Sequence, residues 1–247
     1  MSRKAIELEP DNYVAYYHWG EKLSSGWCDG TTTEWHGGKK QLLKVVELTT
    51  EAIKIDPKDI NALWYRGNAY ERLNFAVEAI NDFSKVIDIE PDNVEVYKRR
   101  ADLKFYCGNS KSEDLLGAID DYSKIIDLTN DKNYCFVRAW AKKELHLYHE
   151  AIEDYTLGIE AGIDDYYFER ARVKEIVYDF EGAIEDYLKG IEIAPTFRCY
   201  MGLCKIYYNR NEIDQAQEYF DKAIELAPDI EEKEMKLYFK NLAAALF

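Results

Sequence analysis

Apolar residues recur along this chain at nearly constant intervals. The dipeptide Ala-Ile stands at residues 79–80, 118–119, 151–152 and 183–184, with weaker counterparts at 45–46 and 216–217, so successive copies are 34, 39, 33, 32 and 33 residues apart. Five of the six copies have an aromatic residue four positions later, namely Phe83, Tyr122, Tyr155, Tyr187 and Phe220. Most have a small residue 12 positions earlier, namely Gly67, Ala139, Ala171 and Cys204. A fixed period of this length predicts a repeat protein.

Proline closes most of the repeating units, at Pro57, Pro91, Pro195 and Pro228. Proline ends a helix because its ring clashes with the preceding turn and its nitrogen donates no hydrogen bond. Each unit is therefore predicted to be two short helices joined by a turn. The sequence predicts an all-α chain of six such units, at residues 11–57, 58–91, 92–130, 131–163, 164–195 and 196–228.

The second unit shows most clearly which family the chain resembles. It reads Ala62-Leu63-Trp64-Tyr65-Arg66-Gly67-Asn68-Ala69-Tyr70, followed by Ala79-Ile80, Phe83 and Pro91. This pattern resembles the tetratricopeptide repeat, and the likeness extends over nearly all of residues 1–247. The resemblance implies a single right-handed superhelix of antiparallel helix pairs, in which the first (A) helix of each pair lines a concave groove. One pair of this size cannot cover its own apolar face, so neighbouring pairs must stack.

Two features depart from the repeat. The first unit carries an insertion at residues 24–40 with four glycines, three threonines, Trp27 and Trp35, which predicts a loop. Residues 1–10 and 229–247 resemble half-repeats that lack their partner helix. We expect either that the chain is a piece of a longer array or that the half-repeats complete each other between chains, in a head-to-tail contact.

Arginine and aspartate recur together in the four central units. Arginine precedes the small residue and aspartate precedes the aromatic one, in the pairs Arg66 and Asp82, Arg100 and Asp121, Arg138 and Asp154, and Arg170 and Asp186. The first and last units lack both residues, which suggests that the two side chains touch. We predict a fork-shaped ion pair between the helices of each unit. Four copies of one pair favour a structural role over a catalytic one.

The charge of the chain limits its partners. There are 32 Lys and Arg residues against 47 Asp and Glu residues, a net charge of −15. Nucleic acids and anionic membranes both require a basic surface, so neither is an expected partner. The five cysteines include no C-x-x-C pair, and the chain has no apolar stretch long enough to span a membrane. These features predict reduced thiols and a cytoplasmic location.

No sequence motif indicates catalysis. The chain lacks G-x-S-x-G, H-E-x-x-H and the phosphate-binding G-x-x-x-x-G-K-[ST]. His146 and His149 are three residues apart but fall near a turn, where a solvated or capping role is expected. Cys28 and His36 share the inserted loop, yet a single thiol makes a poor zinc site. We therefore predict no enzyme activity, no cofactor and no metal.

The predicted groove carries the candidate binding site. When the A helices are aligned on their repeated small residue, the positions that face the groove carry mostly large aromatic and basic residues. These are Tyr17, Trp64, Asn68, Arg72, Lys98, Arg99, Phe136, Trp140, Phe168, Arg172, Met201, Lys205 and Tyr208. Such a surface offers a peptide apolar pockets and charged anchors. The alternative for any one ring is that it only packs between neighbouring A helices. The carboxylate clamp of some family members is not expected, because Glu21 in the first A helix would repel the carboxylate.

Two functions are compatible with this sequence. The first is a non-enzymatic protein–protein interaction scaffold that binds a peptide or partner segment in the concave groove. The alternative is a substrate-recruiting or regulatory segment of a larger enzyme whose catalytic part lies outside this chain. The full reading frame distinguishes them, since only the second requires a catalytic domain beside the repeats.

Overall fold

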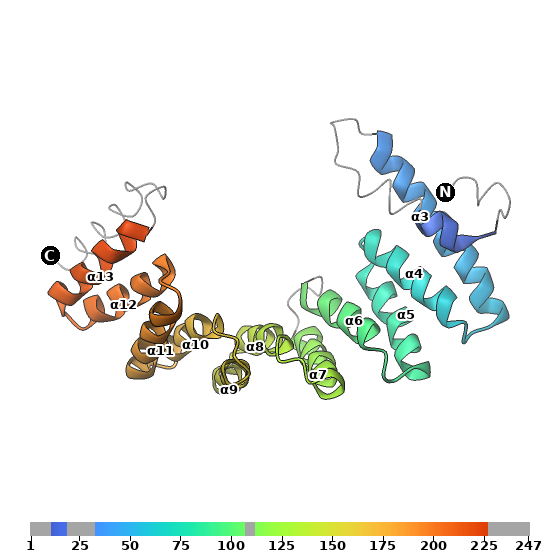
Figure 1. Cartoon of the computed structure of the whole chain (residues 1–247). Coiled ribbons are helices and arrows are strands. Elements are labelled where there is room, and N and C mark those ends of the chain that lie inside the picture. The colour runs from blue at the N-terminus through green and yellow to red at the C-terminus, as the bar shows by residue number, and fades with distance from the viewer. Residues whose placement is uncertain (1–10, 19–32, 107–111, 227–247) are drawn as a thin grey trace. The chain divides into compact units, whose positions relative to one another are not determined.

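The computed structural model describes residues 11–18, 33–106 and 112–226, with side chains from residue 38 onward in the second range. Every regular element within these ranges is an α-helix (Figure 1). The chain divides into two compact units, residues 1–134 and 135–247. The half-repeats expected at 1–10 and 229–247, and the side chains of Trp27 and Trp35, lie outside the described part of the chain.

The first unit alternates A and B helices. Residues 13–18 form the first A helix and α3 (Thr33–Ile55) its B helix. Next come α4 (Ile60–Arg72) with α5 (Ala76–Ile89), and α6 (Val94–Tyr106) with α7 (Ser112–Thr129). Each A helix packs against its own B helix, and α4 and α6 also pack against the B helix that precedes them. This is the arrangement expected of stacked helix pairs.

The second unit repeats the arrangement three times. Its pairs are α8 (Tyr134–Glu144) with α9 (Tyr148–Glu160), α10 (Tyr166–Ile176) with α11 (Phe180–Ile193), and α12 (Phe197–Asn209) with α13 (Ile213–Leu226). α10 packs on both α9 and α11, and α12 on both α11 and α13. The predicted fold class, an all-α array of antiparallel helix pairs, is confirmed.

Local sequence explains where the helices end. α3, α5 and α11 each end two residues before a proline, at Pro57, Pro91 and Pro195. At the start of α4, the carboxylate of Asp59 accepts a hydrogen bond from the backbone N–H of Ala62 over 3.0 Å. Such a cap satisfies one of the N–H groups that the first turn of a helix leaves without a partner. Proline and capping residues therefore set the boundaries of the repeats.

The turn inside a helix pair uses one recurring backbone conformation. Asn74, His146, Tyr178 and Asn211 occupy the same place in their repeats, and their φ angles are 63°, 61°, 63° and 62°. In each of these turns the next residue donates a backbone hydrogen bond to the carbonyl five residues before it, as from Phe75 to Tyr70 over 2.9 Å. A left-handed residue closes a helix in this way. The chain therefore reverses direction at the same point in each of these four repeats.

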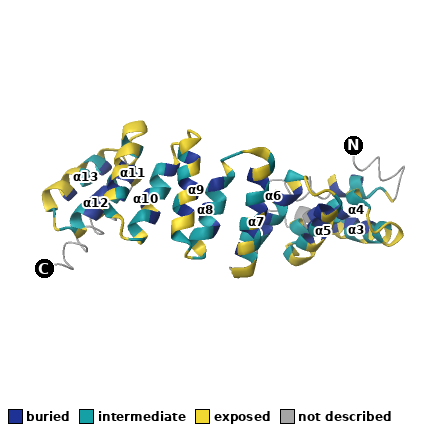
Figure 2. Ribbon diagram, turned by 90° about the horizontal axis from the view of Figure 1, so that it is seen from below, coloured by how far each residue is buried: buried dark blue, intermediate teal, exposed yellow. Residues whose placement is uncertain are grey.

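The repeated aromatic residues of four B helices lie in the core. Phe83, Tyr122, Tyr155 and Tyr187, on α5, α7, α9 and α11, are all buried, and Figure 2 shows buried and exposed faces on the same helices. The repeated small residue makes room for the ring: a Cβ on Gly67 would lie 2.7 Å from Cε1 of Phe83. In this repeat, the small residue and the aromatic residue of the hydrophobic period therefore pack against each other.

The structure corrects the extent of the predicted loop at residues 24–40. Helix α3 begins at Thr33, so residues 33–40 are helical, while residues 24–32 lie outside the described part. The two glycines at 37–38 suggested a loop, but glycine costs a helix only about 1 kcal/mol relative to alanine. Leu42 and Val45 are buried against Tyr17 and Ala69 in one cluster, and this packing anchors the helix.

Candidate functional site

In the first unit, the predicted groove residues gather around Trp64 on α4. Its indole ring contacts Phe83, with ring centroids 5.6 Å apart, and the guanidinium of Arg99 lies 5.8 Å from its centroid. Arg99 also contacts Glu71 over 3.1 Å and Glu95 over 3.0 Å, so acidic neighbours balance its charge. Lys98 and Arg72 are exposed. This part of the surface is aromatic and mixed in charge.

Two residues that we expected on the groove surface are buried in the first unit. Tyr17 is 7% exposed and packs edge-on against Tyr65, with ring centroids 5.3 Å apart. Asn68 is 2% exposed, and its side-chain amide donates to the backbone carbonyl of Trp64 over 2.7 Å. Neighbouring helices cover both positions, so the structure places Tyr17 and Asn68 inside the packing.

In the second unit, the A helices carry three partly exposed aromatic residues. Phe136 and Trp140 lie one turn apart on α8, with ring centroids 6.3 Å apart, and Phe168 lies on α10. Phe136 also contacts the buried Tyr155 at 6.1 Å, and Phe168 contacts the buried Tyr187 at 6.0 Å. Phe136 and Phe168 are therefore anchored by the core, and all three rings are only partly buried.

Basic side chains lie over these rings. Nζ of Lys143 is 5.8 Å from the Trp140 ring centroid. The guanidinium groups of Arg172 and Arg198 lie 5.8 Å and 6.0 Å from the Phe168 centroid. A cation within about 6 Å of a ring centroid is attracted by the negative face of the ring. Rings and cations therefore lie next to one another on the A helices of residues 135–226.

A pocket of about 350 Å³ opens where this surface meets the C-terminal ends of the A helices. Its lining comes from α8, α10 and α12 and from the turn before α9, and includes Lys143, His146, Tyr148, Arg172, Ile176 and Lys205, together with Glu144 and Glu175. Of these residues, sequence reasoning singled out Arg172 and Lys205 as binding residues and missed Lys143 and Glu175. Lys143 could have been found from its place three residues after Trp140. The remaining predicted residues of this unit, Met201 and Tyr208, are partly buried on α12.

Glu175 organises one wall of the pocket. Its two oxygens accept hydrogen bonds from the hydroxyl of Tyr187 and from Nζ of Lys205, the latter over 2.7 Å. Burial, and then the hydrogen bond to Glu175, raise the pKa of Tyr187 well above its ordinary value. The tyrosine therefore stays protonated and holds the carboxylate, which in turn holds Lys205 in place.

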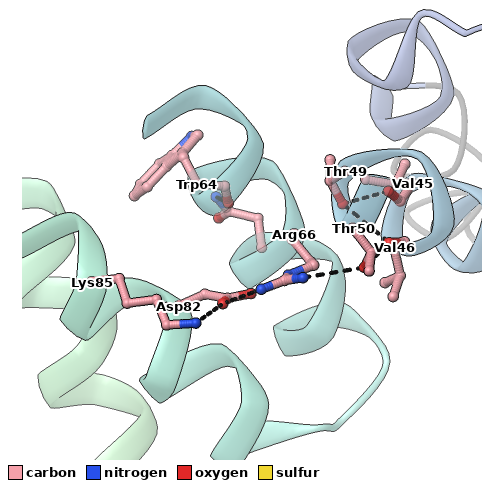
Figure 3. A network of polar contacts seen from close by, with 9 residues as sticks. Val45, Val46, Thr49, Thr50, Trp64, Arg66, Asp82 and Lys85 are labelled. Carbon is pink, nitrogen blue, oxygen red and sulfur yellow. Dashed lines mark hydrogen bonds and ion pairs between the residues drawn. The ribbon is translucent and has the colours of Figure 1, made fainter. Parts of the chain in front are cut away.

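The four predicted Arg–Asp pairs are all present as two-hydrogen-bond contacts. In each pair, Nε donates to Oδ2 and Nη2 donates to Oδ1 of the aspartate. Between Arg66 and Asp82, the Nε–Oδ2 and Nη2–Oδ1 distances are both 2.7 Å (Figure 3). Asp82 is 2% exposed, and its hydrogen bonds raise the pKa of Arg66. These buried pairs join the two helices of a repeat and do not reach the groove surface.

The same arginines also link neighbouring repeats, which sequence reasoning missed. Nη1 of Arg66 donates to the hydroxyl of Thr50 over 3.1 Å (Figure 3), Arg100 to Ser84 over 2.9 Å, and Arg170 to Thr156 over 2.9 Å. Each hydroxyl belongs to the preceding B helix and donates onward to a backbone carbonyl of that helix. The sequence carries a signal for these hydrogen bonds. A Ser or Thr directly follows the repeated aromatic residue, or follows Thr49 in the first repeat.

A lysine completes three of the four pairs. Lys104, Lys142 and Lys174, each four residues after its arginine, contact Asp121, Asp154 and Asp186 over 3.0, 2.8 and 2.9 Å. Tyr70 takes this position beside Arg66. Two cations per buried carboxylate satisfy its oxygens, so these aspartates are fully engaged in holding the fold.

No metal site is formed by the side chains that the structure describes. No group of three His, Cys, Asp or Glu residues among them could hold a metal ion. Nδ1 of His146 lies 2.7 Å from the hydroxyl of Tyr148, and His149 is exposed. Cys28 and the side chain of His36 lie outside the described part. None of the helices in the described ranges is long and apolar enough to cross a membrane.

Comparison with known proteins gives a family for the last repeat and a fold for the chain. Residues 197–230 match the family model described as tetratricopeptide repeat. No curated protein sequence matches the chain. Among solved structures, the MamA protein is similar with a TM-score of 0.59 and 22% identity, over 68% of this chain and 92% of that one. YrrB, described as a TPR protein with an unusual peptide-binding site, has a TM-score of 0.57 and 16% identity, over 79% and 99%.

A third structure extends the likeness over more of the sequence. PilW, a type IV pilus biogenesis factor, has a TM-score of 0.56 and 16% identity, and the match covers 91% of this chain and 98% of that chain. At sequence identities this low, the comparison shows a shared fold and not a shared activity. The helix pairs and the left-handed turns of the described ranges agree with that fold. The chain contains a tetratricopeptide repeat at residues 197–230 and has the fold of the tetratricopeptide repeat proteins.

Proposed function

We propose that this chain is a non-enzymatic protein–protein interaction scaffold that binds a partner segment on the A-helix surface of residues 135–226. The observation that carries the proposal is the row of Phe136, Trp140 and Phe168. All three rings are only partly buried, and Phe136 and Phe168 rest on buried tyrosines of the core. Aromatic residues and arginine are the side chains that most often dominate the energy of protein interfaces.

The other polar clusters of the repeats are already engaged in the fold. The four buried aspartates are bound by arginine and also contact a lysine, at 2.8 to 3.0 Å in three repeats and at 3.9 Å between Asp82 and Lys85. These groups cannot turn to a partner without leaving a buried charge unpaired. The rings of α8 and α10 are only partly buried, and the cations of α8, α10 and α12 line a pocket, so these side chains are accessible to a partner. This contrast favours the A-helix surface as the binding surface.

The solved relatives supply an independent reason. The structure of YrrB is described as that of a TPR protein with an unusual peptide-binding site, so this fold holds peptides in at least that protein. We infer a similar use here from the fold and from the exposed rings.

The three described free cysteines, all buried, fit the cytoplasmic location that we propose.

Selection from a display library of random 12-residue peptides on the purified chain tests this function. We expect enrichment of peptides that bind wild type and bind a variant carrying Trp140→Ala and Phe168→Ala at least about tenfold more weakly, because truncating an aromatic hot-spot residue costs about 2 kcal/mol or more. The matched control carries Leu157→Ala and Leu188→Ala, two exposed apolar residues on the B helices. Peptides that lose binding to the control and keep it to the aromatic variant would contradict the proposal.

A further inference from the structure

We propose that Tyr200, Tyr207 and Tyr219 form a docking site for a basic, proline-rich segment of a partner. The site lies in the last described repeat, where α12 and α13 pack against each other. It uses none of the rings of α8 and α10 that carry the proposed function, and it therefore gives the chain a second interaction surface of different chemistry.

The last described repeat lacks the ion-pair network of the repeats before it. Leu203, Tyr207 and Tyr219 stand at the positions where the preceding repeat has the arginine, the lysine and the aspartate of that network. Leu188 stands where an earlier B helix supplies the hydroxyl that binds the arginine of the next repeat. Apolar and aromatic residues therefore replace every member of the network together, and they replace a set of mutually satisfied charges.

The three tyrosine rings lie against one another. The rings of Tyr207 and Tyr219 are stacked, with centroids 5.4 Å apart and planes 14° apart, and the Tyr200 ring lies 6.4 Å from that of Tyr219. Tyr200 and Tyr207 are seven residues apart, which is two helical turns, so they share one side of α12. Tyr207 and Tyr219 also pack against the buried core, yet all three residues are partly exposed. The site is thus a fixed aromatic surface.

The hydroxyl groups of these three tyrosines are available to a ligand. None of them forms a hydrogen bond with any residue that the structure describes. The repeated tyrosines of other B helices behave differently, because Tyr122 donates to Asp102 over 2.8 Å and Tyr187 donates to Glu175. No buried side-chain oxygen in the described ranges lacks a partner, so the three free hydroxyls reach solvent. The site therefore offers ring surface together with hydrogen-bond donors.

A proline-rich segment matches these two properties. Its extended helix has no internal hydrogen bonds, so its carbonyl groups accept from outside, and proline itself has no N–H to satisfy. Aromatic surfaces are a recurring means of binding such segments, because the pyrrolidine rings pack on them and little conformational entropy is lost. An α-helical partner satisfies its own carbonyl groups and would leave the tyrosine hydroxyls unused. The combination of rings and free donors therefore favours the extended, proline-rich partner.

The charge of the neighbouring helices adds a basic residue to this partner. α11 and α13 both pack against α12, and each contains one lysine, Lys189 and Lys222, which lie 2.6 Å and 2.5 Å from a glutamate of their own helix. Other exposed acidic residues of these helices form no ion pair with a described residue, namely Glu185, Asp214, Asp221 and Glu225. Arginine or lysine beside the prolines would gain from this negative surface.

A synthetic peptide of consecutive prolines with two arginines at each end, carrying a fluorescent label, is the probe. We expect saturable binding to the purified chain by fluorescence anisotropy, weakened by raised salt. The triple variant Tyr200→Phe, Tyr207→Phe and Tyr219→Phe keeps the rings and removes the hydroxyls, so it should bind at least about tenfold more weakly with an unchanged urea unfolding curve. The control Tyr106→Phe with Tyr178→Phe removes hydroxyls from exposed tyrosines elsewhere and should change the affinity less than about twofold.

Two altered peptides test the chemistry of the partner. We expect binding to be lost when glycine replaces every proline, and also when glutamate replaces every arginine. Equal binding of the glycine peptide, no binding of the proline peptide to wild type, or no effect of the triple variant would overturn the site. Trp140→Ala with Phe168→Ala should leave this binding unchanged. If that variant alone abolished it, the peptide would lie on the A-helix surface, and the proposed function would stand without the second site.

Discussion

Arg170 and Asp186 join the two helices of one repeat through a pair of parallel hydrogen bonds. Nε lies 2.8 Å from Oδ2 and Nη2 lies 2.6 Å from Oδ1, and the aspartate side chain is 4% exposed. Removing the arginine would leave a buried carboxylate with Lys174 as its remaining cation, 2.9 Å away. Breaking such a pair commonly costs about 3–5 kcal/mol. We therefore predict that Arg170→Leu lowers the free energy of unfolding by about 3 kcal/mol in urea denaturation.

Arg172 provides the matched control for this prediction. It lies two residues further along the same helix, and its side chain is 53% exposed. Exposed ion pairs contribute at most about 1 kcal/mol, so Arg172→Leu should change the free energy of unfolding by less than that. Equal losses in the two variants would show that the Arg170 pair has no special structural role.

The close approach of rings to glycine predicts a second stability effect. A Cβ on Gly67 would lie 2.7 Å from Phe83, and a Cβ on Gly202 would lie 2.3 Å from Cζ of Tyr187. Both rings are buried and cannot move away, so Gly67→Ala and Gly202→Ala should each destabilise the protein by about 1–3 kcal/mol. Gly190→Ala is the comparison, because a Cβ there would lie 3.1 Å from Sγ of Cys199 and no closer to any other atom. Thermal unfolding that ranks Gly190→Ala as the most damaging change would refute this packing account.

Buried tyrosines predict how stability depends on pH. Burial raises the pKa of Tyr187 above its ordinary value of 10.0, so the folded protein keeps this proton at a pH where the unfolded chain loses it. The associated stability is complete below pH 10 and is lost as the pH rises above 10. Tyr187→Phe should therefore flatten the fall in unfolding free energy between about pH 9 and 11. Tyr178→Phe, which removes a hydroxyl from a residue that is 81% exposed, should leave the slope as in wild type.

Burial also predicts that the described cysteines are unreactive. It raises the pKa of Cys204 to about 12 and also raises that of Cys199, while Cys135 is 0% exposed. The thiolate is the reactive form, so these thiols should resist modification at pH 8 in the native protein. In a Cys28→Ser and Cys107→Ser background, we expect a thiol reagent to modify them only after unfolding. Rapid modification of the native protein would contradict the buried placement.

The sequence was sufficient to predict the fold because the residues that pack together or end a helix recur at the same positions of successive repeats. The ring of Tyr155 and the small residue Ala139 are both buried, and Pro91 ends a helix where the period requires an end. The joint presence and absence of arginine and aspartate also identified partners 16 or 21 residues apart, as in Arg66 with Asp82 and Arg100 with Asp121.

What the sequence could not show was the direction of side chains near the surface. Asn68 occupies a predicted groove position but bonds to its own helix, since the carbonyl of Trp64 is its nearest acceptor one turn away. Lys143 and Glu175 each lie five residues after the repeated arginine, and the packing of their helices brings them to one pocket. The glycines at 37–38 favour a loop by their intrinsic backbone preference, but the packing of α3 overrides that preference.

Photo-crosslinking of a display-selected peptide, followed by mass spectrometry, tests the central claim most directly. A photoreactive group within the peptide reports which helices lie beside it, and the A and B helices have distinct sequences. We predict crosslinks on α8, α10 and α12, near Trp140, Phe168 and Lys205. Crosslinks confined to α9, α11 and α13 would place the partner on the B helices and would contradict the account.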